Sequence, residues 1–225
     1  MRYHPGLNRK FARHISSTYS TLSATRCGAH LLGLWWWPPL ALCSSWRRAT
    51  PREPMNVIIS GQSSPQVLTA TGFLTYVQAV GFSTECLDKH GGAPFAANLG
   101  DGAGARNQTV EYREAFGDPM LGTCVEELLG GNHLRVFGPQ AGSGALFLAT
   151  SIEAGLFQNH TIIPDGYNVG RDAFARMATG VNQFNGTTFS TTAQTLTGVM
   201  PSGSDGINHG IAVDGDAVLL TVTVM

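Results

Sequence analysis

Acidic residues are absent from the first 52 positions of this 225-residue chain, although eight of its 14 basic residues lie there. The other six basic residues and all 15 acidic residues follow, so residues 53–225 carry a net charge of −9. An acidic body is unsuited to a phosphate backbone, and no nucleic acid partner is expected. With 43% apolar and 13% charged residues, the chain also lacks the composition of a disordered protein.

Common nucleotide, zinc and calcium motifs are missing as well. The sequence has neither a G-x-x-x-x-G-K-[ST] phosphate loop nor an H-E-x-x-H zinc motif. Residues 102–107 depart from a dinucleotide fingerprint because asparagine stands at the last glycine position. Asp205, Asp214 and Asp216 lie among glycines without the spacing of an EF-hand. We therefore expect no cofactor and no metal.

The N-terminal segment lacks the roughly 20 apolar residues that a membrane-spanning helix needs. Its apolar stretch, Leu31–Cys43, contains two adjacent prolines, follows an acid-free Arg/Ser-rich region and precedes two arginines. Residues 1–52 therefore predict a targeting segment, read as a cleaved signal peptide with small residues Ala41 and Cys43 at the cleavage site. A retained signal anchor, which would make the protein membrane-anchored, and a mitochondrial presequence are the alternatives.

The cysteines and glycosylation sequons favour secretion. Removal of the segment takes away Cys27 and Cys43 and leaves Cys86 and Cys124 as a single pair. Such a pair invites a disulfide in an oxidising compartment, whereas two buried free thiols are the alternative. The chain also has three N-x-[ST] sequons, at Asn107, Asn159 and Asn185. Together these features predict a secreted or extracellular glycoprotein.

Hydrophobic patterns predict one α+β domain over residues 53–225, with a mixed β-sheet and two or three helices. Apolar or alternating runs predict strands at 56–60, 132–137, 144–151, 160–163 and 217–224. Helical spacing predicts helices at 64–81, 121–129 and 167–178, the first with Ser64 as its N-cap. Residues 90–106 are rich in glycine and are expected to form a long loop.

A family resemblance accompanies these patterns. Asn132–Phe137 and His160–Asp165, followed by Arg171 and Asp172, resemble strings in a domain at the C-terminus of LssY-type bacterial membrane proteins. The resemblance covers about residues 54–225 and is closer still to secreted fungal proteins that contain the paired cysteines. It implies an α+β fold. It brings no reaction, because the family has no settled activity.

A group of polar residues forms the candidate site. His133 and Arg135 are two positions apart on a predicted strand, so their side chains share one face. If the neighbouring elements meet there, six residues converge: His133, Arg135, His160, Asp165, Arg171 and Asp172. The arginines and Asp172 would then bind a small anionic or sugar-like ligand through charge-assisted hydrogen bonds.

Two other functions stay open beside this ligand-binding module. A hydrolase would use His133 or His160 as its base, with Asp165 to orient it. A structural extracellular protein would have no site, and Arg135 would then form an ion pair with Asp165 or Asp172. In that case His160 would only hydrogen-bond to the backbone.

Tryptophan content tests the cleavage of the N-terminal segment. The four tryptophans are Trp35, Trp36, Trp37 and Trp46. Protein isolated from its natural host after cleavage should therefore show tyrosine-like fluorescence only. Its intact mass should also report the lost segment, one disulfide and the attached glycans. Tryptophan emission, or a mass that includes residues 1–52, would contradict cleavage.

Overall fold

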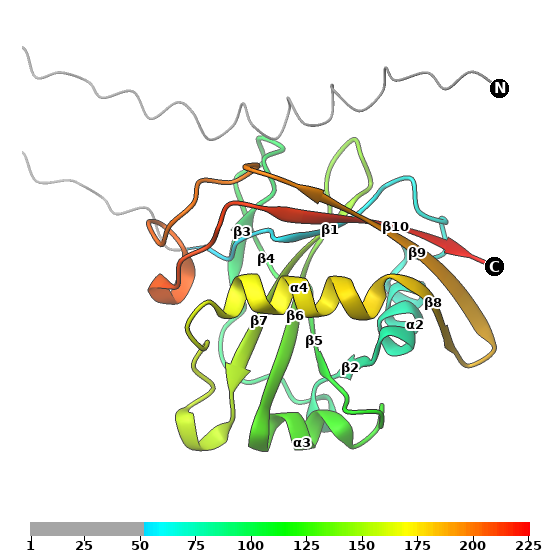
Figure 1. Ribbon diagram of the computed structural model, residues 1–225, viewed down its shortest axis with the longest axis horizontal. Coiled ribbons are helices and arrows are strands. Elements are labelled where there is room, and N and C mark those ends of the chain that lie inside the picture. Colours follow the sequence, from blue (N-terminus) through cyan, green and yellow to red (C-terminus); the bar gives the residue numbers. More distant parts are fainter. Residues whose placement is uncertain (1–51) are drawn as a thin grey trace, which may run out of the picture.

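A computed structural model describes residues 52–225 of the chain. The predicted targeting segment, residues 1–52, lies outside the described residues except for Arg52. Eight strands of the described part form one curled sheet (Figure 1). The strands are β1 (Val57–Ile59), β2 (Phe82–Thr84), β5 (Val110–Glu114), β6 (Gly130–Pro139), β7 (Leu146–Ala154), β8 (Gly180–Phe184), β9 (Thr187–Leu196) and β10 (Ala217–Val224). Their order is β2-β5-β6-β7-β1-β10-β9-β8. Only β1 and β10 pair in parallel, so the sheet is mixed.

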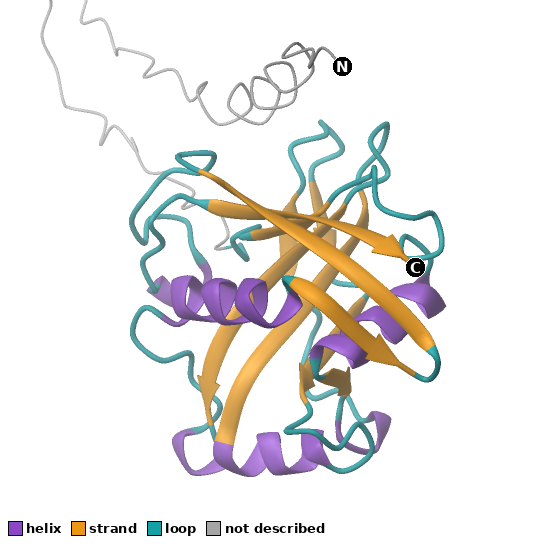
Figure 2. Ribbon diagram, turned by 45° about the vertical axis from the view of Figure 1, so that its right-hand side comes forward, coloured by secondary structure: helices purple, strands orange, loops and turns teal. Residues whose placement is uncertain are grey.

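Helices and a small second sheet pack around the large sheet (Figures 1 and 2). The helices are α2 (Ala70–Val80), α3 (Gly122–Leu129) and α4 (Gly166–Ala178), with short 3-10 helices η1 (Cys86–Asp88), η2 (Leu156–Gln158) and η3 (Asn208–Gly210). The small sheet is the hairpin β3 (Ala96–Asn98) and β4 (Ala105–Asn107). Strands dominate this single mixed α/β domain, and three α-helices lie within the described residues, as the sequence predicts.

The predicted helix at 64–81 is shorter than expected, and its predicted N-cap is wrong. Ser64 donates its backbone N–H to the Val222 carbonyl, and its hydroxyl accepts from the N–H of Val224, so it is tied to β10. The helix begins at Ala70. Its N-cap is Thr69, whose side-chain hydroxyl accepts a hydrogen bond from the backbone N–H of Gly72. Gly81 then ends the helix in the left-handed conformation.

Two other predictions also need correction. The strand expected at 160–163 is only an isolated bridge between Ile162 and Glu153, because His160 has a φ of 51° and breaks the extended backbone. The loop expected at 90–106 holds β3 and the start of β4. The strands predicted at 56–60, 132–137, 144–151 and 217–224 are confirmed as β1, β6, β7 and β10.

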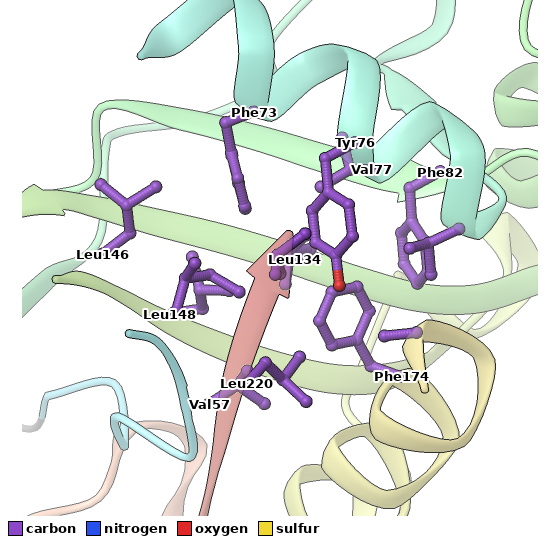
Figure 3. Close-up of a cluster of buried hydrophobic side chains, with 14 of the residues drawn as sticks. Val57, Phe73, Tyr76, Val77, Phe82, Leu134, Leu146, Leu148, Phe174 and Leu220 are labelled. Carbon is purple, nitrogen blue, oxygen red and sulfur yellow. The ribbon is translucent and has the colours of Figure 1, made fainter. Parts of the chain in front are cut away.

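The main hydrophobic core lies where α2 and α4 cover one face of the sheet (Figure 3). Alternate residues of β6 and β7, including Leu134 and Leu148, point into it and are fully buried. Tyr76 of α2 meets Phe189 edge-on, with ring centroids 5.4 Å apart. The other residues of β5, β6 and β7 therefore face the opposite side, which α3 and the β3–β4 hairpin cover.

A disulfide joins Cys86 of η1 to Cys124 of α3, as the cysteine count predicts. It is compatible with an oxidising compartment. No helix among residues 52–225 has the length and apolarity that crossing a membrane requires.

Removal of a core side chain tests this packing. We expect Leu134→Ala to lower the free energy of unfolding by about 2–5 kcal/mol, because it leaves a cavity under α2. Val181→Ala, on a residue 67% exposed in β8, is the control and should change stability by less than about 0.5 kcal/mol. Chemical denaturation measures both. Equal stability of the two variants would contradict the placement of Leu134.

Candidate functional site

Six charged residues meet on the sheet face that lies opposite the main core. They are Glu111 and Arg113 of β5, Glu126 of α3, His133 and Arg135 of β6, and Glu153 of β7, and we call them the ionic cluster. Because side chains alternate along a strand, residues two apart share this face. Strand register places Glu111 beside Arg135 and Arg113 beside His133. The first pair brings opposite charges together across the strands. The second pair brings two cations together, and Glu126 contacts both of them.

His133 is at the centre of the cluster and has no exposed surface. Its Nε2 lies 2.7 Å from Glu126 Oε1. Its Nδ1 lies 3.0 Å from Glu111 Oε1 and 3.1 Å from Glu153 Oε1, a contact shared between two carboxylates. Both ring nitrogens therefore face carboxylate oxygens, which only a doubly protonated imidazole can satisfy with two donors.

Arg135 is 3% exposed and equally enclosed. Its Nη2 donates to Glu153 Oε1 at 2.6 Å and its Nη1 to Ser151 Oγ at 3.2 Å. Its Nε lies 3.3 Å from Glu111 Oε2. The ring of Phe95, just before β3, covers the guanidinium with its centroid 4.8 Å from Cζ. Arg135 is thus shielded from solvent and already paired with carboxylates.

Arg113 links the cluster to α3 and to the segment before η1. Its Nη1 donates to Glu126 Oε2 at 3.1 Å, so both oxygens of this fully buried carboxylate have a cationic partner. Its Nη2 lies 3.4 Å from Glu85 Oε1. Gly131 leaves the room this requires, since a Cβ there would lie 2.8 Å from Glu126 Cγ.

The charges of the cluster balance only when His133 is protonated. Three glutamates then face two arginines and one imidazolium. Burial alone would lower the pKa of His133, but its contacts with Glu111, Glu126 and Glu153 outweigh burial and raise the pKa to about 10. The pKa of Glu153 would rise on burial, yet His133 and Arg135 lower it to about 2. The pKa of Glu111 is lowered for the same reasons.

This protonation state bears on catalysis and on ligand binding. A histidine with a pKa near 10 holds its proton at neutral pH and has no free lone pair with which to act as a base. The Nη atoms of Arg113 and Arg135 already contact carboxylates, so an anion would have to displace a glutamate from them. The Nε atoms of both arginines and the Nδ1 atom of His133 are buried without a hydrogen bond of good geometry to any described residue, so the last of these is held at ion-pair distance only. The six charges of the cluster nevertheless balance one another.

The other predicted site residues lie elsewhere, so the six-residue group does not converge. Arg171 forms a two-pronged ion pair with Asp214, at 2.6 and 2.8 Å, and contacts Asp172 at 2.8 Å. Asp165, at the start of α4, accepts from the side chain of Asn168. Within residues 52–225, no hydrogen bond or ion pair joins these groups to His133 or Arg135. Arg171 instead fixes α4 to the loop before β10.

His160 lies apart from the cluster as well. It follows η2 with a left-handed backbone, and its Nδ1 is buried without a hydrogen-bond partner among the described residues. The sequons fall on surface positions: Asn107, Asn159 and Asn185 are all exposed. Their glycosylation stays a prediction.

Sequence reasoning missed four of the six cluster residues, namely Glu111, Arg113, Glu126 and Glu153. The strand residues carried a signal, since polar or charged side chains repeat at a period of two in Glu111-Tyr-Arg113 and in Ser151-Ile-Glu153, as they do in His133-Leu-Arg135. Glu126 carried none, because a glutamate on a short helix among leucines is read as exposed.

One group near the cluster has the residue types of a metal site. The ligand atoms of Glu85, His90 and Glu111 lie within 4.8 Å of one another. Arg113 lies 3.4 Å from Glu85 and 3.9 Å from Glu111, however, so its positive charge already occupies this position. His90 Nδ1 also contacts Glu85 at 2.8 Å. The charges therefore disfavour a cation here.

Helix α3 has its polar side inward and its apolar side outward. Gly122, Thr123 and Glu126 are buried, whereas Leu128 and Leu129 are 52% and 73% exposed. A helix of a soluble domain normally shows the opposite pattern. Glu126 faces inward because it pairs with His133 and Arg113, and Leu128 on the other side of the helix must then face outward. Leu129 is exposed at the last position of the helix.

These outward residues belong to a larger apolar surface, which we call the apolar end. It holds nine of the twelve large hydrophobic residues that are exposed among residues 52–225: Leu87, Phe116, Met120, Leu121, Val125, Leu128, Leu129, Leu156 and Phe157. They come from η1, α3 with its preceding turn, and η2, which lie together at one end of the domain (Figure 2). The disulfide ties η1 to α3. Gly155 brings η2 against α3, since a Cβ there would lie 2.2 Å from Leu128 O.

Comparisons of the chain with protein-family models, with curated proteins and with solved structures found no match. The resemblance to the LssY-type domain stays a prediction.

The ionic cluster predicts how stability depends on pH. The raised pKa of His133 contributes stability that is complete below pH 6.5 and is lost as pH rises toward about 10. The lowered pKa of Glu153 contributes stability that is complete above pH 4.5 and is lost as pH falls toward about 2. The contribution of these two groups should therefore be largest between pH 4.5 and 6.5.

Denaturation over this pH range measures the effect. His133→Gln should cost about 3–5 kcal/mol at pH 6, because it leaves buried carboxylates without a cation. It should also remove most of the loss of stability on the alkaline side. Val181→Gln, on an exposed residue of β8, is the control and should behave as the wild type. An unchanged alkaline slope in His133→Gln would show that the imidazole is neutral.

Proposed function

We propose that this protein is a single-domain binding protein that contacts its partner through the apolar end. The observation that supports this most directly is the inverted orientation of α3, which buries Glu126 and exposes Leu128 and Leu129. Nine exposed large hydrophobic residues gather on three adjoining elements, and clustered apolar surface of this kind marks interaction sites. The ionic cluster then serves to hold α3 in this orientation.

The other two hypotheses draw less support from the geometry. A small anionic or sugar-like ligand at the cluster would need an open, unpaired Arg135, which instead is buried and contacts Glu153. A hydrolase based on His133 would need an unprotonated imidazole, and the pKa of about 10 disfavours one. A hydrolase based on His160 would need a carboxylate to orient its ring, and the Nδ1 of His160 has no hydrogen-bond partner among the described residues.

We further propose that the protein acts outside the cell, either secreted or held at the membrane by its N-terminal segment. The disulfide between Cys86 and Cys124 supports an oxidising compartment. The exposure of Asn107, Asn159 and Asn185 leaves the three sequons accessible for glycosylation. A purely structural role would give the apolar end no purpose, because nothing in the described residues covers it.

Binding of Nile red, a neutral apolar dye, tests whether the apolar end is a contact surface. Met120 and Phe157 are 83% and 85% exposed, so replacing both by glutamate should leave the fold intact. The full chain should bind the dye, and the Met120→Glu/Phe157→Glu variant should lose most of this fluorescence. Val181→Glu, which changes an equally apolar exposed residue on β8, should keep it. Equal dye binding by all three proteins would contradict the proposal.

A further inference from the structure

We propose that the apolar end docks on the surface of a lipid bilayer whose headgroups are zwitterionic, such as phosphatidylcholine. This inference rests on the proposed function and names the partner of the same surface. It follows from three properties of that surface: the chemistry of its side chains, the hydrogen bonding of its backbone and the charges around it.

The side chains of the apolar end offer almost no polar contacts. The nine residues are leucine, methionine, phenylalanine and valine. Hydrocarbon requires no hydrogen bond from its partner, so such a surface can enter the edge of a bilayer. Phenylalanine and methionine are also enriched in protein interfaces, so the composition is compatible with both occupants, and the backbone and the charges favour one of them.

Several backbone N–H groups in the exposed turns are already hydrogen-bonded within the protein. Asp118 Oδ1 accepts from the N–H groups of Met120 and Leu121, at 2.9 and 3.1 Å. In η2, the N–H of Gln158 donates to the Gly155 carbonyl at 2.9 Å. An N–H group without a partner would oppose entry into a low-dielectric layer. Met120 and the residues beside Phe157 can thus approach lipid without leaving these donors unpaired.

Charges beside the apolar end distinguish among occupants. Asp88, Asp118 and Glu127 lie in the same segments, and Lys89 alone opposes them with an exposed positive charge. Two copies of the chain joined through this surface would bring their carboxylates together, and an anionic membrane would repel them. The outermost group of a phosphatidylcholine headgroup is a trimethylammonium cation, which complements the carboxylates.

The exposure of these residues also favours docking. The nine residues are between 42% and 85% exposed, so much of their apolar surface is available for burial. Peripheral binding strength scales with buried apolar area. The surface therefore needs no basic residues to bind a neutral bilayer.

Flotation with phosphatidylcholine vesicles tests the proposal on the full chain. The Met120→Glu/Phe157→Glu variant should partition to the vesicles at least about tenfold more weakly than the wild type, because two side chains that the bilayer would bury become charged. Val181→Glu should partition as the wild type does. The N-terminal segment is common to all three proteins, so a difference between them reports the apolar end. Replacing part of the phosphatidylcholine by phosphatidylserine should weaken the binding that depends on this end.

Hydrogen exchange localises the contact. With vesicles present, amides of α3 and η2 should exchange more slowly, whereas those of the turn between β8 and β9 should not change. The lipid proposal is overturned if the wild type and the double variant float equally, or if α3 and η2 gain no protection. Dye binding that still depends on Met120 and Phe157 would then leave the proposed function standing. A concentration-dependent dimer in ultracentrifugation, lost in the double variant but not in Val181→Glu, would assign the surface to a second copy.

Discussion

The pairing of a fully buried His133 with three carboxylates is the contact on which the rest of the structure depends. Glu126 reaches the imidazole from α3, so this helix must turn its charged side toward the sheet. In an α-helix, residues three and four apart share a face. Gly122 and Thr123 therefore lie on the buried side with Glu126, and Leu128 lies on the far side. Leu129, three positions after Glu126, is exposed where the helix ends. The buried Glu126 and the exposed Leu128 are two consequences of one helix orientation.

The same pairing explains why the cluster is not an open binding site. With His133 protonated, the three glutamates and three cations are balanced, and the remaining neighbour Glu85 has its pKa raised by burial and by the charge of Glu111. An additional anion would be repelled by the three glutamates, because each cation of the cluster already contacts at least one of them. Breaking one ion pair in such a network lowers the free energy of unfolding strongly, because it leaves a buried charge without a partner. Replacing the whole pair by apolar residues of similar volume changes the free energy of unfolding much less.

Much of the fold follows from sequence patterns, but the site depends on contacts that such patterns do not contain. The continuous apolar run of β10 and the alternation of β6 predict strands because burial enforces those patterns locally. Strands β8 and β9 were missed because both are exposed along much of their length and β9 is rich in threonine, so neither shows a clear apolar alternation. The shared face of His133 and Arg135 was predicted correctly from their spacing. Their partners were not, because the pairing of β5 with β6 and the inward turn of Glu126 join residues that are distant along the chain.

The inverted helix also argues for a rigid docking surface. The disulfide fixes α3 to η1, Glu126 fixes it to β5 and β6, and Gly155 allows η2 to pack against its end. An apolar surface on a mobile segment would lose conformational entropy when it bound, whereas one that is already held in place loses little. These three contacts hold α3 in place with Leu128 and Leu129 exposed to solvent. A helix held in this way is explained if its exposed surface binds an apolar partner without rearrangement.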